Sequence, residues 1–129
     1  AAVGVVQLRK LPGFAARRQE ISRRYDEAFS GLAGLKTLPV DYSEVAPHIY
    51  VVKVAAERRE AFMEHLKAAG VGTGVHYIAN HSQPHFKRFC REPLPRAERL
   101  TAEIVTLPLH CSLSDADVNA VIAAVRSAP

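Results

Sequence analysis

The chain contains 129 residues, of which 48% are hydrophobic and 23% are charged, and its formal net charge at pH 7 is +4. These values are typical of one globular domain with a single core. No apolar run approaches the roughly 18 residues that a membrane span needs, and the opening segment 1–8 is too short for a signal peptide and has no basic residues before it. We therefore expect neither membrane insertion nor secretion.

The first third of the chain is predicted to be helical. Residues 1–11 form an apolar helical stretch that we expect to be kinked or broken near Pro12. From 14 to 32 the apolar residues recur at intervals of three, four or seven while arginines fill the opposite side, which is the pattern of an amphipathic helix. Gly31 and Gly34 end this helix, and 39–47 is a connecting segment.

The rest of the chain alternates predicted strands and helices. We predict strands at 48–54 and 71–77, helices at 57–69 and from Pro95, a brief extended piece at 107–109, and a last helix after Ser114. Pro108 confines the extended piece to a sheet edge. Ser114 and Asp117 have the spacing of a capping box at the start of the last helix. This order predicts an α/β (α+β) fold with helices packed on one face of a small sheet.

The two cysteines, Cys90 and Cys111, belong to no CxxC pair. They form neither a disulfide framework nor a zinc knuckle, so we expect free thiols and a cytoplasmic location.

Basic residues are concentrated in two clusters. The first contains Arg9, Lys10, Arg17, Arg18, Arg23 and Arg24, and the second contains Lys87, Arg88, Arg91, Arg96 and Arg99. Such surfaces attract anions, including the phosphates of a nucleic acid or of a nucleotide-linked metabolite. A solvated helix face with its usual arginines explains the same pattern, and we favour that explanation.

The polar segment after the second predicted strand is the densest in functional side chains. It contains His76, Tyr77, Asn80, His81, Gln83 and His85. Imidazole, phenol and amide groups donate and accept hydrogen bonds to hydroxyls and phosphates, which suits a sugar or nucleotide ligand. Two other interpretations stay open. One is an ordinary surface loop. The other, less favoured because the ligand spacings of five, four and five match no common zinc pattern, is a metal site of His76, His81, His85 and Cys90.

Other catalytic patterns are absent from the sequence: it has no GxSxG, Walker-type loop, GxGxxG or CxxC motif. The residues alone therefore indicate a binding domain with a loop rich in histidine and tyrosine.

Several blocks, in order, resemble the C-terminal part of the pyridoxal-phosphate-dependent nucleotide-sugar aminotransferases of the DegT/StrS family. Segments 1–11 and 16–29 resemble the long helix that joins the two domains of that family. Residues 70–84, GVGTGVHYIANHSQP, are similar to its G-x-x-T-x-x-H-Y-x-P-x-H-x-Q-P block. Segments 94–109 and 113–122 are similar to the end of the same chains. The resemblance covers nearly the whole sequence.

This resemblance implies a small, mostly antiparallel sheet of about three strands packed by helices, like the C-terminal domain of fold-type I aminotransferases. It implies that 1–129 is a single small C-terminal domain, with 1–33 as the inter-domain helix region and the large cofactor-binding domain absent. Family members transfer an amino group, commonly from glutamate, to a nucleotide-linked keto sugar, and are usually homodimers. Their pyridoxal phosphate is bound chiefly by the large domain, which carries the Schiff-base lysine. We therefore expect this chain alone to bind no cofactor and to be inactive.

The resemblance also implies site residues. The substrate-binding positions are His76, Tyr77 and His81, with Asn80 and Gln83 as further substrate-side residues. No catalytic residue and no metal ligand is assigned, and none of the five lysines lies in a context like that of the family's lysine. Ala79 stands where the family generally has proline. The partners implied are a nucleotide sugar and a second subunit, not a nucleic acid or a membrane. The alternative function is a free-standing binding module whose basic face takes an anionic partner.

Overall fold

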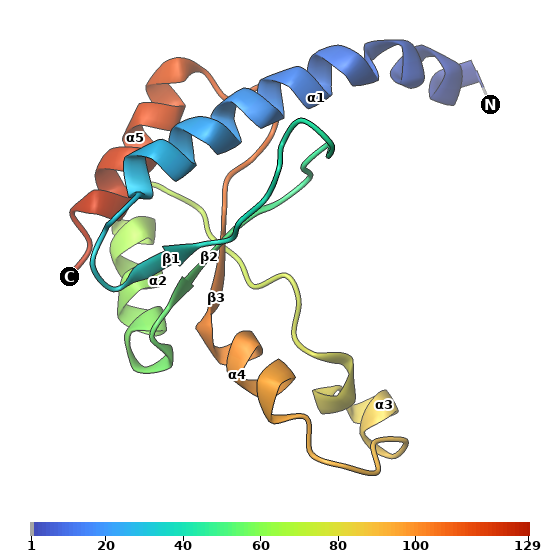
Figure 1. Cartoon of the computed structure of the whole chain (residues 1–129), viewed down its shortest axis with the longest axis vertical. Coiled ribbons are helices and arrows are strands. Elements are labelled where there is room, and N and C mark those ends of the chain that lie inside the picture. The colour runs from blue at the N-terminus through green and yellow to red at the C-terminus, as the bar shows by residue number, and fades with distance from the viewer. Residues whose placement is uncertain (1) are drawn as a thin grey trace.

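The computed structural model describes residues 2–129 of the chain (Figure 1). Its helices and strands follow in the order α1 (Ala2–Phe29), β1 (Leu35–Thr37), β2 (Tyr50–Val54), α2 (Arg59–Ala68), α3 (Pro84–Lys87), α4 (Pro95–Glu103), β3 (Ile104–Leu107) and α5 (Asp115–Arg126). Short 3-10 turns cover Ala56–Arg58 and Asn80–Ser82. Among the described residues, no helix has the length and apolar character needed to cross a membrane.

The three strands form one antiparallel sheet in the order β1-β2-β3. Leu35 of β1 lies opposite Val54, and Tyr50 of β2 lies opposite Leu107. Alternate residues of β2 are buried, as expected for a strand with one face against a core. The predicted α/β (α+β) fold with a small antiparallel sheet of three strands is confirmed.

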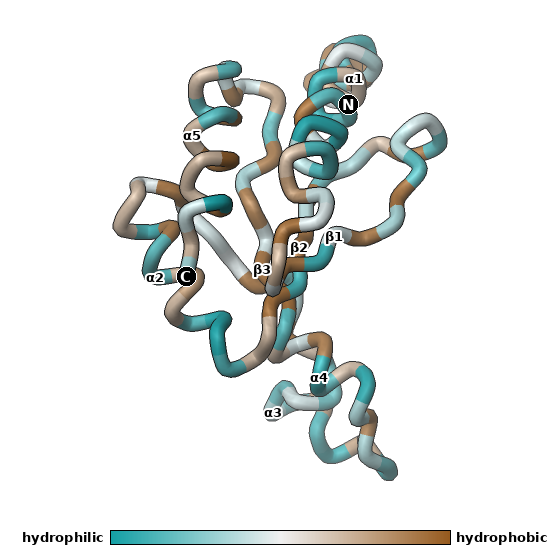
Figure 2. Tube along the Cα trace, turned by 60° about the vertical axis from the view of Figure 1, so that its left-hand side comes forward, coloured by the Kyte–Doolittle hydropathy of each residue, from teal (hydrophilic) through white to brown (hydrophobic). Residues whose placement is uncertain are grey.

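The core lies between the sheet and helices α1, α2 and α5 (Figures 1 and 2). From α1 it takes Ile21, Tyr25 and Phe29, which recur at four-residue intervals and are almost fully buried. The Tyr25 ring stacks on Phe29 at 5.6 Å between centroids and meets the edge of Tyr50 at 5.0 Å. These contacts fix the C-terminal half of α1 against the sheet.

The predicted break at Pro12 is wrong, because α1 runs through it as one helix. Proline removes one backbone hydrogen bond, yet Pro12 is exposed, so water can satisfy the carbonyl that the missing N–H leaves free. The half of α1 before Pro12 extends beyond the core (Figure 1). Its side chains are exposed, with Val3 at 75% and Leu8 at 67%.

The predicted strand 71–77 is also wrong. Only Gly74 of that segment pairs with the sheet, through one isolated bridge to Thr106 of β3. The third strand is instead β1, within the stretch that follows Gly34. The sequence of β1 has three residues and no alternation long enough to stand out, so its pairing with β2 makes it a strand.

The other predicted elements are found with shifted ends. The strand predicted at 48–54 is β2, and the helix predicted at 57–69 is the 3-10 turn followed by α2. The extended piece predicted at 107–109 lies earlier, because β3 ends at Leu107 before Pro108. The capping box at Ser114 and Asp117 is present at the start of α5, with both reciprocal hydrogen bonds formed.

Residues 75–103, which we call the arm, project from the sheet as the lower part of the molecule in Figure 1. The arm carries α3 and α4, and its far end lies away from the core formed by α1, α2 and α5. It begins at the bridge to β3 and returns to the sheet at β3, so both of its ends are attached to the same strand.

Candidate functional site

The arm starts from a close contact between backbones. The Gly74 N–H donates to the Thr106 carbonyl (3.2 Å), and the Thr106 N–H donates back to Gly74 (2.7 Å). The His76 ring lies over Gly74, where a Cβ atom would come within 2.8 Å of the His76 Cε1. A side chain at position 74 would therefore displace the His76 ring.

The residues after this bridge form an open groove on the arm. Its lining, which we call the arm groove, consists of Val75, Tyr77, Ile78, Asn80, Gln83, Pro84, His85 and Phe86. Tyr77 is 71% exposed, and its ring meets His76 edge-on at 5.0 Å between centroids. Exposed aromatic faces beside two amide groups provide both stacking and hydrogen-bonding surfaces.

The structure brings together three of the five predicted site residues in the arm groove, namely Tyr77, Asn80 and Gln83. His76 is exposed beside Tyr77 but does not line the groove. Val75, Ile78 and Phe86, which were not among the predicted site residues, line it as well. The signal that could have found them is the presence of large apolar side chains within a polar, irregular segment.

His81 lies away from the arm groove, against α4. Its side chain is 15% exposed, and its Nε2 atom is 3.4 Å from the Glu98 Oε1 atom. This is ion-pair distance, yet the angles are not those of a hydrogen bond and Nε2 has no hydrogen-bond partner. His81 thus contacts helix α4, on which the loop rests, and does not line the arm groove.

The described residues contain no group of three or more histidine, cysteine or acidic side chains placed to hold a metal ion. The His85 ring packs edge-on against the Phe86 and Phe89 rings, at 5.1 Å and 6.3 Å between ring centroids. Both cysteines are free thiols, as expected, and the Cys90 thiol donates to the Glu92 carbonyl (3.0 Å).

The first basic cluster is partly used inside the molecule. Arg17 donates to Asp115 Oδ1 (2.9 Å) and to the Leu113 carbonyl (2.7 Å), and Arg24 donates to the same Asp115 oxygen (2.7 Å) and to Asn119. These hydrogen bonds to Arg17 and Arg24 hold the pKa of Asp115 below its usual range. Arg17 and Arg24 therefore attach α1 to α5, and the face proposed to take an anionic partner loses these two charges.

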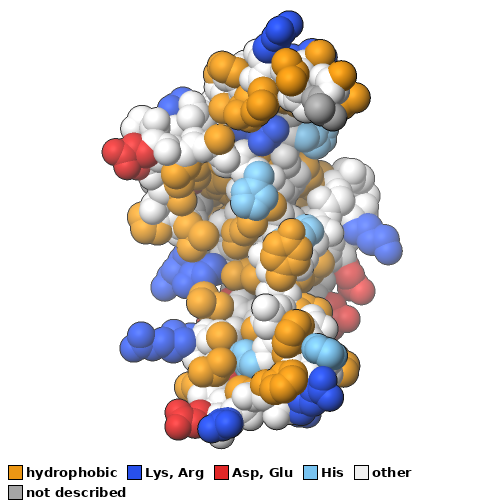
Figure 3. Space-filling model, turned by 90° about the vertical axis from the view of Figure 1, so that its right-hand side faces the viewer, with side chains coloured by type: hydrophobic (Ala, Val, Ile, Leu, Met, Phe, Trp, Pro, Cys, Tyr) orange, Lys and Arg blue, Asp and Glu red, His pale blue; other side chains and the backbone are white. Residues whose placement is uncertain are grey.

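The second basic cluster lies on the arm, where the Arg88 guanidinium stands 4.8 Å over the Phe89 ring. Figure 3 shows the face that carries both the arm and the N-terminal end of α1. Hydrophobic side chains gather there at both ends of the molecule, with basic side chains among them.

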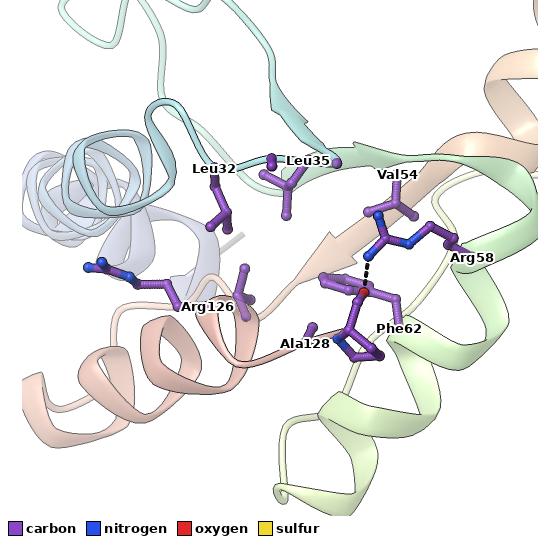
Figure 4. Close-up of a pocket in the computed structure, with 11 residues that line it drawn as sticks. Leu32, Leu35, Val54, Arg58, Phe62, Arg126 and Ala128 are labelled. Carbon is purple, nitrogen blue, oxygen red and sulfur yellow. Dashed lines mark hydrogen bonds between the residues drawn. The ribbon is translucent and has the colours of Figure 1, made fainter.

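A second hollow lies between β1, α2 and the C-terminal residues (Figure 4). Leu32, Leu35, Val54 and Phe62 give it an apolar wall, and Arg58 closes it by donating to the Pro129 carbonyl. Arg126, the other charged residue of the lining, points away from Arg58, so the two arginines do not face a common point in this hollow.

The same fold occurs in solved aminotransferases. The aminotransferase TlmJ from Streptoalloteichus hindustanus is 38% identical over 98% of this chain and 34% of its own, with a TM-score of 0.90. DesV from S. venezuelae, solved with a ketimine intermediate, is 28% identical over 97% of this chain and 34% of its own (TM-score 0.88). Spr1654 from Streptococcus pneumoniae, solved in PLP and PMP forms, is 30% identical over 97% and 33% (TM-score 0.87).

The present chain thus spans about a third of the length of the solved chains that it matches. The resemblance noted in the sequence extends through the fold, from the long first helix to the capped last one. The family match covers residues 1–126, and the chain belongs to the DegT/DnrJ/EryC1/StrS aminotransferase family.

Proposed function

We propose that this chain is the small C-terminal domain of a sugar aminotransferase. The complete enzyme transfers an amino group, commonly from glutamate, to a keto sugar linked to a nucleotide. Within it, the arm groove forms one side of the substrate pocket. The observation that carries this proposal is the exposed groove itself, which joins the Tyr77 ring to the amides of Asn80 and Gln83. Aromatic and amide groups together suit a ligand with both ring faces and hydroxyl groups.

His76 and His81 complete the proposed substrate side. His76 is exposed next to Tyr77, where its imidazole can donate to or accept from a hydroxyl or phosphate oxygen. His81 belongs to the same loop, and we assign it to shaping the pocket through its contact with α4.

The cofactor implied by the family is pyridoxal phosphate, which supplies an electron sink and an aldehyde for the amino group. The residues of this chain do not by themselves form a site for this cofactor. A lysine amine is required, and the arm groove is lined by none. Lys36 and Lys53 lie on the sheet, and Lys53 pairs with Glu103 (4.0 Å). We therefore propose that the lysine and the cofactor cradle belong to the rest of the enzyme and that this chain alone is inactive.

We also propose that the complete enzyme forms a homodimer. The exposed apolar side chains on the first half of α1 support it, since apolar patches of this kind promote association. A cytoplasmic location is supported by the two free thiols, which persist in reducing compartments.

The proposal is tested by kinetics on the complete enzyme with nucleotide-linked keto sugars and glutamate. We expect Tyr77→Ala to raise the KM for the sugar by about tenfold, because a stacking contact at an exposed site is worth about 1 to 1.5 kcal/mol. Tyr42→Phe is the matched control, because Tyr42 lies in the core away from the arm. The proposal would be overturned if the enzyme aminated none of these sugars, or if Tyr77→Ala left the KM for the sugar unchanged.

The absence of cofactor chemistry in the isolated chain is tested separately. After incubation with pyridoxal phosphate, borohydride reduction and digestion, we expect no stoichiometric adduct at any one of the five lysines. A single lysine that is fully trapped would place the Schiff-base residue in this chain and contradict the proposed division of roles.

A further inference from the structure

The loop that carries the candidate substrate residues is held from behind by α4. The Ala79 N–H donates to the Thr101 hydroxyl (3.2 Å), and His81 lies 3.4 Å from Glu98. Thr101 and Glu98 are three residues apart, so they occupy adjacent turns on one side of the helix. Two contacts from one helix face therefore meet the loop just after Tyr77.

Each of the two α4 residues is itself fixed. Arg59, at the start of α2, donates to the Thr101 carbonyl (2.5 Å), which ties the end of α4 to the core helices. The Glu98 carboxylate also accepts from the Leu94 N–H (3.4 Å), the residue that caps α4. The same carboxylate oxygen thus accepts from the Leu94 N–H and lies within ion-pair distance of His81.

The loop is held at its other end by the bridge between Gly74 and Thr106. Only four residues, 75–78, lie between this bridge and Ala79. A segment so short, anchored at both ends, has few conformations available, so the anchors set where the Tyr77 ring stands.

From this geometry we infer that Thr101 and Glu98 are positioning residues for the arm groove, acting through Ala79 and His81. This inference rests on the proposed function, because the groove is taken as one side of the substrate pocket. Thr101 and Glu98 do not line the groove, so they act on the substrate only by holding the loop that does.

The first measurement needs no enzyme activity. In the chain of 129 residues, Thr101→Val removes the acceptor and keeps the side-chain shape, so we expect the Ala79 amide to exchange its hydrogen about fivefold faster. Thr101→Ser keeps the hydroxyl and should restore the wild-type rate. If Thr101→Ser exchanges as fast as Thr101→Val, the methyl group rather than the hydrogen bond matters, and the inference is overturned.

The second measurement is kinetic and uses the complete enzyme. Thr101→Val and Glu98→Gln should each raise the KM for the sugar substrate by about fivefold and change kcat less than twofold, because a displaced loop weakens binding without touching the reacting atoms. Glu98 is exposed, so Glu98→Gln should still fold if Thr101→Val does not. Glu103→Gln is the control, since Glu103 lies on the same helix and pairs with Lys53 and Arg99 instead.

The outcomes separate this inference from the proposed function. If KM is unchanged in both variants while Tyr77→Ala raises it, the groove binds substrate but α4 does not position it, and the inference is overturned. If the wild-type enzyme aminates no nucleotide-linked keto sugar, the proposed function fails, and the role of α4 in substrate positioning fails with it. The exchange rate at Ala79 would then still report whether the anchor forms.

Discussion

A group of tyrosine hydroxyls lies beneath the C-terminal half of α1. The Tyr50 hydroxyl donates to Asp26 Oδ1 (2.6 Å), and the Tyr25 hydroxyl donates to the Pro108 carbonyl (3.1 Å). Tyr42, on the connection between β1 and β2, is also buried. Burial of a phenol requires a partner for its hydroxyl, so these bonds allow large rings to fill the core without leaving polar groups unpaired.

We expect Tyr50→Phe to lower the free energy of unfolding by about 1 to 3 kcal/mol, because it removes a short hydrogen bond to a carboxylate. Urea denaturation measures the change. Tyr77→Phe is the control, since Tyr77 is exposed on the arm, and it should alter stability by less than about 0.5 kcal/mol. Equal losses in the two variants would show that the bond to Asp26 does not stabilise the fold.

The same phenols predict a response to alkali. Burial raises the pKa of Tyr25 to about 12, and burial followed by the charge of Asp26 raises the pKa of Tyr42 to about 12. In the unfolded chain, tyrosine ionises near about pH 10. Between these values the unfolded state loses protons that the folded state keeps, so the free energy of unfolding falls as pH rises.

Denaturation curves between about pH 9 and 12 test this response, with the ordinary tyrosine pKa of about 10 as the reference. Tyr25→Phe should make the decline shallower, because one of the retained protons is then absent from both states. The phenolate absorbance of Tyr25 is the difference between the wild-type protein and Tyr25→Phe, and if it develops near the ordinary pKa in the folded state the assignment is contradicted.

Helix α5 is capped by Ser114, the residue immediately before it. The Ser114 hydroxyl accepts from the Asp117 N–H (3.1 Å), and the Asp117 carboxylate accepts from the Ser114 N–H (2.9 Å). The Ser114 hydroxyl, which also donates to the Asp117 carboxylate (2.7 Å), and then the Ser114 N–H hold the pKa of Asp117 below its usual range. Because α5 buries Val118, Val121 and Val125 in the core, a change at its start affects the whole domain.

We expect Ser114→Ala to lower the free energy of unfolding by about 1 kcal/mol, the usual effect of removing an N-cap side chain. Thermal denaturation followed by circular dichroism gives the measurement. Ser112→Ala, two residues earlier and also exposed, is the control and should leave the midpoint unchanged. A similar loss from both substitutions would assign the effect to the connecting segment rather than to the cap.

For the molecule as a whole, the uncovered half of α1 is the most unusual surface. Val3, Val5, Val6, Leu8 and Leu11 are all at least 44% exposed on one helix. Figure 1 shows this part of α1 extending beyond the sheet and α5, and the exposed fractions show that these side chains are largely uncovered. Apolar side chains concentrated at one end of a domain favour contact with another protein surface.

We expect the isolated chain to associate with itself as its concentration rises. Sedimentation over a range of concentrations measures this. A double substitution, Val5→Asp with Leu8→Asp, should shift the species toward the monomer by placing charge on the apolar surface. Ala120→Asp adds charge at an exposed position of α5 and should leave association unchanged. A monomer at all concentrations would show that this surface has no affinity for its own copy.

The sequence was sufficient to predict those features that depend on interactions between residues close together in the chain. The amphipathic repeat over 14–32 predicted the buried face of α1, and the Ser114 box predicted the start of α5, because helix periodicity and capping involve residues only three or four apart. The polar loop after Gly74 was likewise recognised from its residue types, and three of its predicted site residues meet in the arm groove.

Contacts between distant residues could be seen only in the folded chain. The short β1 is a strand because it pairs with β2, whereas 71–77 is not one because only Gly74 reaches β3. Arg17 lies 98 residues from Asp115, so the hydrogen bond between them could not be predicted from the local sequence pattern. The contact between His81 and Glu98 of α4 likewise joins two separate elements and could not be seen in the local pattern. Such contacts depend on how separate elements pack, and the free energy of that packing depends on residues from several segments together.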